Sequence, residues 1–76
     1  MVKAYIMMKT ATGASEGIVD AASDLSEISE VHIIAGDFDL IAEVTVDEVY
    51  EILHAAASKL QGIEGIVETR TYIALE

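Results

Sequence analysis

Four consecutive residues, Gly36-Asp37-Phe38-Asp39, separate two apolar runs at 31–35 and 40–46. Glycine can adopt positive φ, and aspartate side chains can accept hydrogen bonds from neighbouring backbone amides, so the four residues predict a tight hairpin turn. Two carboxylates and several free amides on a rigid support could bind a small polar ligand. Phe38 is hard to bury within its own subunit, which favours a site that a neighbouring subunit completes.

A purely structural interpretation of this turn stays open, because the same residues would suit any hairpin that needs a polar turn. Two threonines on another predicted strand, Thr69 and Thr71, are weaker candidates for the ligand site. Their place in the strand alternation puts them on the expected core face, where threonines can simply be packed.

The reactive residues of the chain give little support for nucleophilic catalysis or for metal binding. The chain has no cysteine, and its serines fall at predicted helix ends or surfaces with no patterned partner. His32 and His54 lie on different predicted elements without a further ligand at metal spacing, so neither a metal nor a cofactor is expected. We expect His32 to pair with a carboxylate at an interface. Glu43, Glu68 and Arg70 could form a polar centre on the sheet face, but a structural ion pair that fixes the dimer register is favoured.

Hydrophobic periodicity divides the chain into six elements in the order β-α-β-β-α-β. The expected strands are 2–9, 31–35, 40–46 and 66–75, and the expected helices are 13–27 and 47–62. Asp47 stands where a helix N-cap belongs, and Gly62 is placed to end that helix. With right-handed crossovers, this order predicts an α+β, ferredoxin-like domain over 1–76: a four-stranded antiparallel sheet with both helices on one face.

The two faces of this sheet are expected to differ in composition. The helix-covered face would carry Val2, Ala4, Ile6, Met8, Val31, Ile33, Ala35, Leu40, Ala42, Val44, Val67, Thr69, Thr71, Ile73 and Leu75. The open face would carry Tyr5, Met7, Ile34, Ile41 and Tyr72 among Lys3, His32, Glu43, Glu68 and Arg70. So much apolar surface predicts a twofold dimer with stacked sheets, and a 76-residue chain without disulfides benefits from such association.

The net charge of −10, with only 4 Lys and Arg, argues against direct binding of nucleic acid or of an anionic membrane surface. No stretch approaches the roughly 20 apolar residues that span a bilayer. A cytoplasmic protein is therefore expected.

The Gly-Asp-Phe-Asp turn between apolar strands, an acidic helix cap, and the closing run Gly-Ile-Val-Glu-Thr-Arg-Thr-Tyr-Ile-Ala-Leu together resemble the effector-binding domain of the Lrp/AsnC family. The resemblance covers essentially the whole chain. It implies dimers with stacked sheets that assemble further, commonly as four dimers, and amino-acid binding in clefts between dimers. The matching positions are Gly36, Asp37, Phe38 and Asp39, with Asp39 meeting an amino group and turn amides receiving a carboxylate; Thr69 and Thr71 match positions near the cleft.

The sequence departs from the family pattern at its start, since it begins at the first strand rather than with a helix-turn-helix domain. The expectation is a stand-alone sensing module that regulates transcription or metabolism in trans, for example by joining a full-length Lrp-like regulator. Two alternatives remain: a small dimeric monooxygenase-like enzyme, for which one Phe and no Trp make a poor pocket, and a purely structural assembly unit.

Overall fold

Alternating side chains along the first strand set up a sheet with one apolar face. The structure, a computed structural model, describes residues 1–75, and of residue 55 only the backbone. Strand β1 (Val2–Thr10) leads into helix α1 (Ser15–Ser23), and β2 (Ile28–Ile33) and β3 (Leu40–Val46) follow. A helical run comprises α2 (Val49–Glu51), the π-helical segment η1 (Ile52–Ala57) and α3 (Ser58–Gln61), and β4 (Ile66–Ile73) completes the chain.

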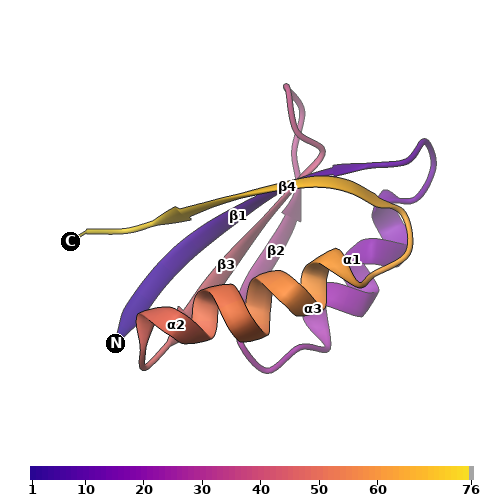
Figure 1. Cartoon of the computed structure of the whole chain (residues 1–76). Coiled ribbons are helices and arrows are strands. Elements are labelled where there is room, and N and C mark those ends of the chain that lie inside the picture. The colour runs from indigo at the N-terminus through magenta and orange to yellow at the C-terminus, as the bar shows by residue number, and fades with distance from the viewer. Residues whose placement is uncertain (76) are drawn as a thin grey trace.

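The strands form one antiparallel sheet in the order β2-β3-β1-β4, so β3 and β1 are central and β2 and β4 are the edges. Both helical segments lie on the same side of this sheet, and the connection between β2 and β3 rises on the other side (Figure 1). The expected ferredoxin-like α+β architecture is confirmed. One helix is interrupted by wider π turns, which the sequence did not indicate.

The core lies between the sheet and the helices. Every core residue is apolar, and together they come from the two central strands and the inner sides of the helices. The set is Ala4, Ile6, Met8, Ile18, Ala22, Leu40, Ala42, Val44, Ile52, Ala56, Ala57 and Leu60. These are the alternating positions of β1 and β3 and a helical stripe, as the periodicity requires.

Four residues that we expected on the covered face are exposed: Ile33, Ala35, Val67 and Leu75. At Val67, which is 70% exposed, the register shifts so that Thr10 pairs with Ile66 while Lys9 pairs with Glu68. Such a bulge adds one residue, and Ile66 packs against the core instead. Ile33 is the last residue of β2, and Ala35 and Leu75 lie past the ends of β2 and β4.

The ends of the second helical run also differ from expectation. Glu48, not Asp47, is the N-cap, and Oε2 of Glu51 accepts hydrogen bonds from the backbone N–H groups of both residues, Asp47 at 3.0 Å and Glu48 at 2.8 Å. Gly62 is the C-cap, as expected. Two apolar residues of this helical run, Val49 and Leu53, face solvent and lie outside the core.

Candidate functional site

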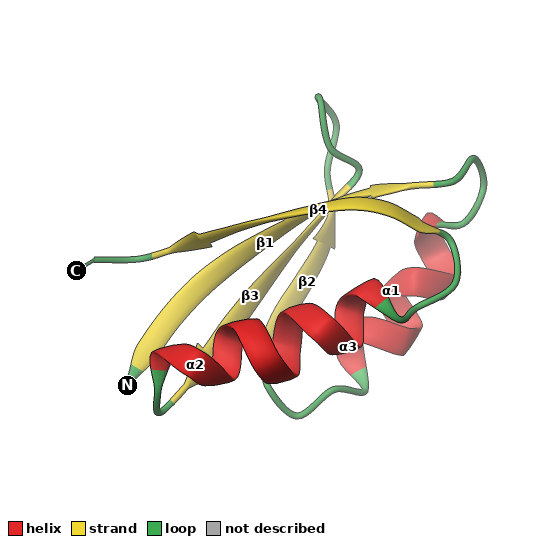
Figure 2. Cartoon of the chain, in the orientation of Figure 1, coloured by secondary structure: helices red, strands yellow, loops and turns green. Residues whose placement is uncertain are grey.

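The connection between β2 and β3, residues 34–39, is the β2–β3 loop. At its base the N–H of Ile34 donates to the carbonyl of Asp39 at 2.8 Å, and the N–H of Asp39 donates to the carbonyl of Met8 at 2.9 Å. The loop then projects away from the sheet, on the side opposite the helices (Figure 2). Its ends are therefore fixed to the central part of the sheet while its tip faces outward.

Asp39 ties this loop to the start of the β1–α1 connection. Its Oδ2 accepts a hydrogen bond from the backbone N–H of Thr10 at 2.9 Å and lies 3.4 Å from the Thr10 hydroxyl. That hydroxyl is also 3.0 Å from the hydroxyl of Ser15. No sequence signal pointed to Thr10, because the contact joins residues 29 positions apart. One carboxylate oxygen of Asp39 is thus already used within the chain.

The tip of the loop offers backbone donors. Within residues 1–75, the N–H groups of the four residues from Ala35 to Phe38 have no intramolecular acceptor. Gly36 has φ of +145°, a conformation that glycine adopts without strain, and Asp37 is exposed beside it. Consecutive free N–H groups suit an anion, and an exposed carboxylate suits a cation.

Phe38 is half-buried by its own chain, which corrects the expectation that it would stand free. Its ring lies 5.7 Å from Nζ of Lys9 and 5.9 Å from the guanidinium carbon of Arg70, on neighbouring strands β1 and β4. Both distances lie within the range of cation–π attraction. The Phe38 ring therefore lies beside two cations of the open face, and Lys9 is a neighbour of the loop that the sequence did not reveal.

Thr69 and Thr71 do not meet the loop within one chain. They pair in register with Met8 and Ile6, which point to the helix-covered face, whereas the loop rises on the other face. Thr69 accepts a hydrogen bond from Nε2 of Gln61 at 3.1 Å and lines a hollow of about 250 Å³ at the β4 edge. The structure brings Gly36, Asp37, Phe38 and Asp39 together and leaves the two threonines apart.

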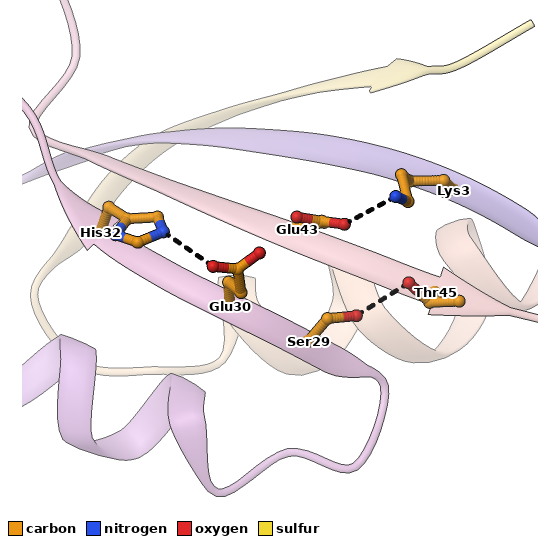
Figure 3. Close-up of polar contacts among 6 residues, drawn as sticks. All are labelled: Lys3, Ser29, Glu30, His32, Glu43 and Thr45. Atoms are coloured by element: carbon orange, nitrogen blue, oxygen red, sulfur yellow. Dashed lines mark hydrogen bonds and ion pairs between the residues drawn. The ribbon is translucent and has the colours of Figure 1, made fainter. Parts of the chain in front are cut away.

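The open face carries ion pairs instead of a single polar centre. Lys3 Nζ is 3.0 Å from Glu43 Oε1, and His32 Nε2 is 3.4 Å from Glu30 Oε1 (Figure 3). The hydrogen bond from Lys3 lowers the pKa of Glu43, and Glu43 in turn raises the pKa of Lys3. This arrangement matches the expected carboxylate partner of His32.

A separate ion pair joins Arg70 Nε to Glu68 Oε2 at 3.0 Å on β4. The hydrogen bond to Glu68 raises the pKa of Arg70. The structure thus divides Glu43, Glu68 and Arg70 between two pairs.

Metal ligands and membrane spans can be assessed for the described part of the chain. No group of three or more His, Cys, Asp or Glu side chains within it is arranged to hold a metal ion. No helix within it is both long and apolar enough to cross a bilayer.

A curated relative supports one family. The leucine-responsive regulatory protein of Haemophilus influenzae is 34% identical over 56 residues, which is 74% of this chain. The chain spans 34% of that relative's own length.

Solved structures with the same fold include TTHA0845 from Thermus thermophilus, with a TM-score of 0.93 and 24% identity over 100% of this chain and 95% of that one. The transcriptional regulator NMB0573 from Neisseria meningitidis, solved as a complex with L-Met, gives a TM-score of 0.86 at 14% identity over 99% of this chain and 50% of that one. The family model described as the Lrp/AsnC ligand binding domain matches residues 3–76. The chain therefore belongs to the Lrp/AsnC ligand-binding domain family.

Proposed function

We propose that this chain is a sensing domain that binds an amino acid or a similar small molecule at the β2–β3 loop. The observation that carries the proposal is the loop tip, where the N–H groups from Ala35 to Phe38 stand free among the described residues, beside two carboxylates. An α-amino acid carries a carboxylate, which could accept hydrogen bonds from the free N–H groups, and an ammonium group, which could pair with the loop carboxylates. Charge-assisted hydrogen bonds of this kind are stronger than neutral ones.

Each loop residue has a distinct role in this proposal. The free amides receive the ligand carboxylate, and Gly36 permits the backbone shape that presents them. Asp37 and the remaining oxygen of Asp39 receive the ammonium group. Because Oδ2 of Asp39 already holds Thr10, Asp37 has the more available carboxylate, and Asp39 both binds and positions the loop.

Relatives make an amino acid the first ligand class to test. One is named a leucine-responsive regulatory protein, and a structural neighbour was solved with L-Met. L-leucine and L-methionine are therefore the first probes, followed by the other amino acids. The regulatory output, in transcription or metabolism, would pass to a partner such as a longer Lrp-like regulator rather than through direct contact with nucleic acid, given the net charge of −10.

Self-association belongs to the same proposal. The open face exposes or half-exposes Tyr5, Met7, Ile41 and Tyr72, and a second copy stacked on it would remove this apolar surface from water. Assembly of dimers into a larger ring, such as a tetramer of dimers, would create clefts beside the loops. Thr69 and Thr71 enter the site only as residues that a neighbouring subunit's loop would reach.

Calorimetric titration of the purified chain with L-leucine and L-methionine tests the site. We expect Asp37→Asn to weaken binding about 10- to 100-fold, the loss expected when a charged hydrogen-bond partner is removed. Asp20→Asn, the same change at an exposed position of α1, is the matched control and should leave affinity unchanged. If no amino acid binds while the oligomer is intact, the sensing role fails and a purely structural assembly unit gains support.

A further inference from the structure

The two edge strands of the sheet differ in their protection against pairing with another strand. Strand β2 is short, and its register with β3 shifts between Ile28 and Glu30, whereas β4 stays in regular register with β1 from Glu68 to Ile73. Short or irregular edges resist the addition of a further strand, and long regular ones favour it. Strand β4 is the foremost strand in Figure 1, and no other segment among residues 1–75 crosses in front of it. The β4 edge is therefore open.

Alternate backbone groups of β4 point out of the sheet. The N–H of Ala74 donates to the carbonyl of Lys3 at 2.9 Å, and hydrogen-bonded pairs alternate along an antiparallel ladder. The even-numbered N–H groups of the strand therefore face β1, and those of Thr69, Thr71 and Ile73 face outward. Because β4 has no second neighbouring strand, these three N–H groups have no backbone acceptor within the described residues. They form a regular row of donors, and the carbonyls of the same residues are the matching acceptors.

Apolar side chains are exposed at both ends of β4. Val67 lines a hollow of about 250 Å³ together with Thr69, and Leu75, which is 95% exposed, lines another of about 330 Å³ together with Val49. On the opposite edge strand, β2, Ile33 is the one large apolar side chain that is fully exposed. Free backbone donors and exposed apolar side chains on one edge suit the addition of an extended strand.

One twofold register pairs all three outward residues of two β4 strands with one another. Copies related by a twofold axis pair antiparallel, and a register centred on Thr71 sets Thr71 opposite itself and Thr69 opposite Ile73. The same register places Arg70 opposite Tyr72 of the second copy, and a guanidinium is attracted to an aromatic ring. A register centred on Arg70 would set like charges directly opposite, which is destabilising. Backbone donors and side-chain charges therefore favour the same register.

We propose that β4 of one copy pairs antiparallel with β4 of a second copy, centred on Thr71, so that two sheets join at their edges. Leu75 of the second copy then lies beside Val67, at the smaller of the two hollows. This contact uses the edge of the sheet and is separate from the stacked dimer, which uses the open face. It needs no ligand, and the two contacts together give an assembly larger than a dimer.

Residue-resolved hydrogen exchange of the full chain, measured by NMR, tests the pairing directly. The N–H of Ile33 is the matched control, because Ile34 donates to Asp39 and the alternation then points Ile33 away from β3. After correction for intrinsic rates, we expect the N–H groups of Thr71 and Ile73 to exchange about tenfold or more slowly than that of Ile33. If they exchange as fast as Ile33, the β4 edge is free and the inference is wrong, while a dimer found by sedimentation would leave the stacked contact standing.

Two substitutions of Tyr72 test the register by the sign of their effects. Tyr72→Glu places a carboxylate opposite Arg70 of the second copy, and Tyr72→Arg places a second guanidinium there. Both variants lose the same tyrosine from the open face, so that loss is common to them. We expect sedimentation equilibrium to give a dissociation constant about tenfold lower for Tyr72→Glu than for Tyr72→Arg.

The net charge of −10 predicts the reverse order, because glutamate raises the general repulsion between chains and arginine lowers it. Equal dissociation constants, or a lower one for Tyr72→Arg, therefore overturn the proposed register. Ligand binding, which calorimetry measures separately, is not affected by that outcome.

Discussion

The two faces of the sheet are built from alternate residues of the same strands, and they differ in almost every property. On β1, Ala4, Ile6 and Met8 are fully buried against the helices, while Tyr5 and Met7 between them are only half-buried. The covered face has no buried polar or charged residue within the described chain. The open face combines apolar side chains with ion pairs and carries the β2–β3 loop.

The difference between the two faces predicts that residues of one face determine folding stability and residues of the other determine binding and association. The covered face stabilises one chain through burial of apolar surface, so changes there should act on folding. The open face and its loop leave apolar surface, backbone donors and carboxylates available, so changes there should act on binding and association. Substitutions at adjacent residues can therefore test whether the division is real.

The largest expected effect is at Ile6. Ile6→Ala should lower the free energy of unfolding by about 2–5 kcal/mol, because it removes buried atoms and leaves a cavity. Urea denaturation followed by circular dichroism, at one fixed protein concentration, measures the change. If the alanine variant does not fold, Ile6→Val should still show a loss of about 0.5–1.5 kcal/mol.

The neighbouring change Met7→Ala is the comparison for Ile6. Met7 lies opposite Ile41 and Arg70 on the open face. Truncation of Met7 should change the dimer dissociation constant strongly and the free energy of unfolding of the monomer only slightly. Equal losses of monomer stability at both positions would contradict the division between the faces.

A smaller effect is expected at Gly65, beside the helix-covered core. Gly65 has φ of +101°, and an added Cβ would lie 3.0 Å from Cβ of Ala14 and 3.2 Å from Cδ1 of Ile18. Gly65→Ala should cost about 2–3 kcal/mol through backbone strain and overpacking together. Thermal unfolding measures this loss.

Gly36→Ala separates these two causes, since Gly36 also has positive φ but an added Cβ there meets nothing within 4 Å. We expect Gly36→Ala to lower the free energy of unfolding by about 1 kcal/mol, from backbone strain alone. A cost at Gly36 as large as that at Gly65 would show that the loop is packed more tightly than the structure indicates.

Much of the fold could be predicted from the sequence because its signals are local. Period-two alternation identified both faces of β1 and β3, and the expected limits of 40–46 coincide with the observed β3. The alternation alone places Val67 on the wrong face, because a bulge changes parity and leaves no local pattern in the sequence. Strand β2 begins at Ile28, before the apolar run, because pairing with β3 extends it into polar residues.

The candidate site was predictable only in part. The turn residues at 36–39 were evident from their types, and the structure places them together on one loop. The neighbours of the turn were not evident, because Thr10, Lys9 and Arg70 approach it through the sheet from distant positions. Tertiary contacts of this kind determine which atoms of Asp39 and Phe38 remain available, and sequence spacing does not encode them.

A third test concerns the two aspartates of the loop. Asp39→Ala should cost about 1–2 kcal/mol, because it removes the acceptor of the Thr10 N–H. Hydrogen exchange at the Thr10 amide should accelerate in the same variant. Asp37→Ala should change the free energy of unfolding by less than about 0.5 kcal/mol, since Asp37 is exposed. If the Thr10 amide stays protected from exchange in Asp39→Ala, Asp39 does not anchor the loop to Thr10.

The smallest expected effect is an ion pair on the helix side, between Lys59 Nζ and Glu27 Oε2 at 2.8 Å. The hydrogen bond from Lys59 lowers the pKa of Glu27 below its usual 4.5. A carboxyl with a lowered folded-state pKa stabilises the fold above its unfolded pKa, and this contribution is lost as the pH falls through the folded-state value. Lys59→Met should therefore cost about 0.5 kcal/mol or less at pH 7, and the difference should shrink below pH 4.5.

The matched change on the open face is Lys3→Met, which removes the partner of Glu43. Chemical denaturation at pH 7 and pH 3.5 provides the folding comparison, and sedimentation provides the association comparison. If the division between the faces is correct, Lys59→Met changes pH-dependent folding and leaves association alone. Lys3→Met should change both, because it removes the hydrogen bond that lowers the pKa of Glu43 and leaves that carboxylate unpaired where the second copy would stack.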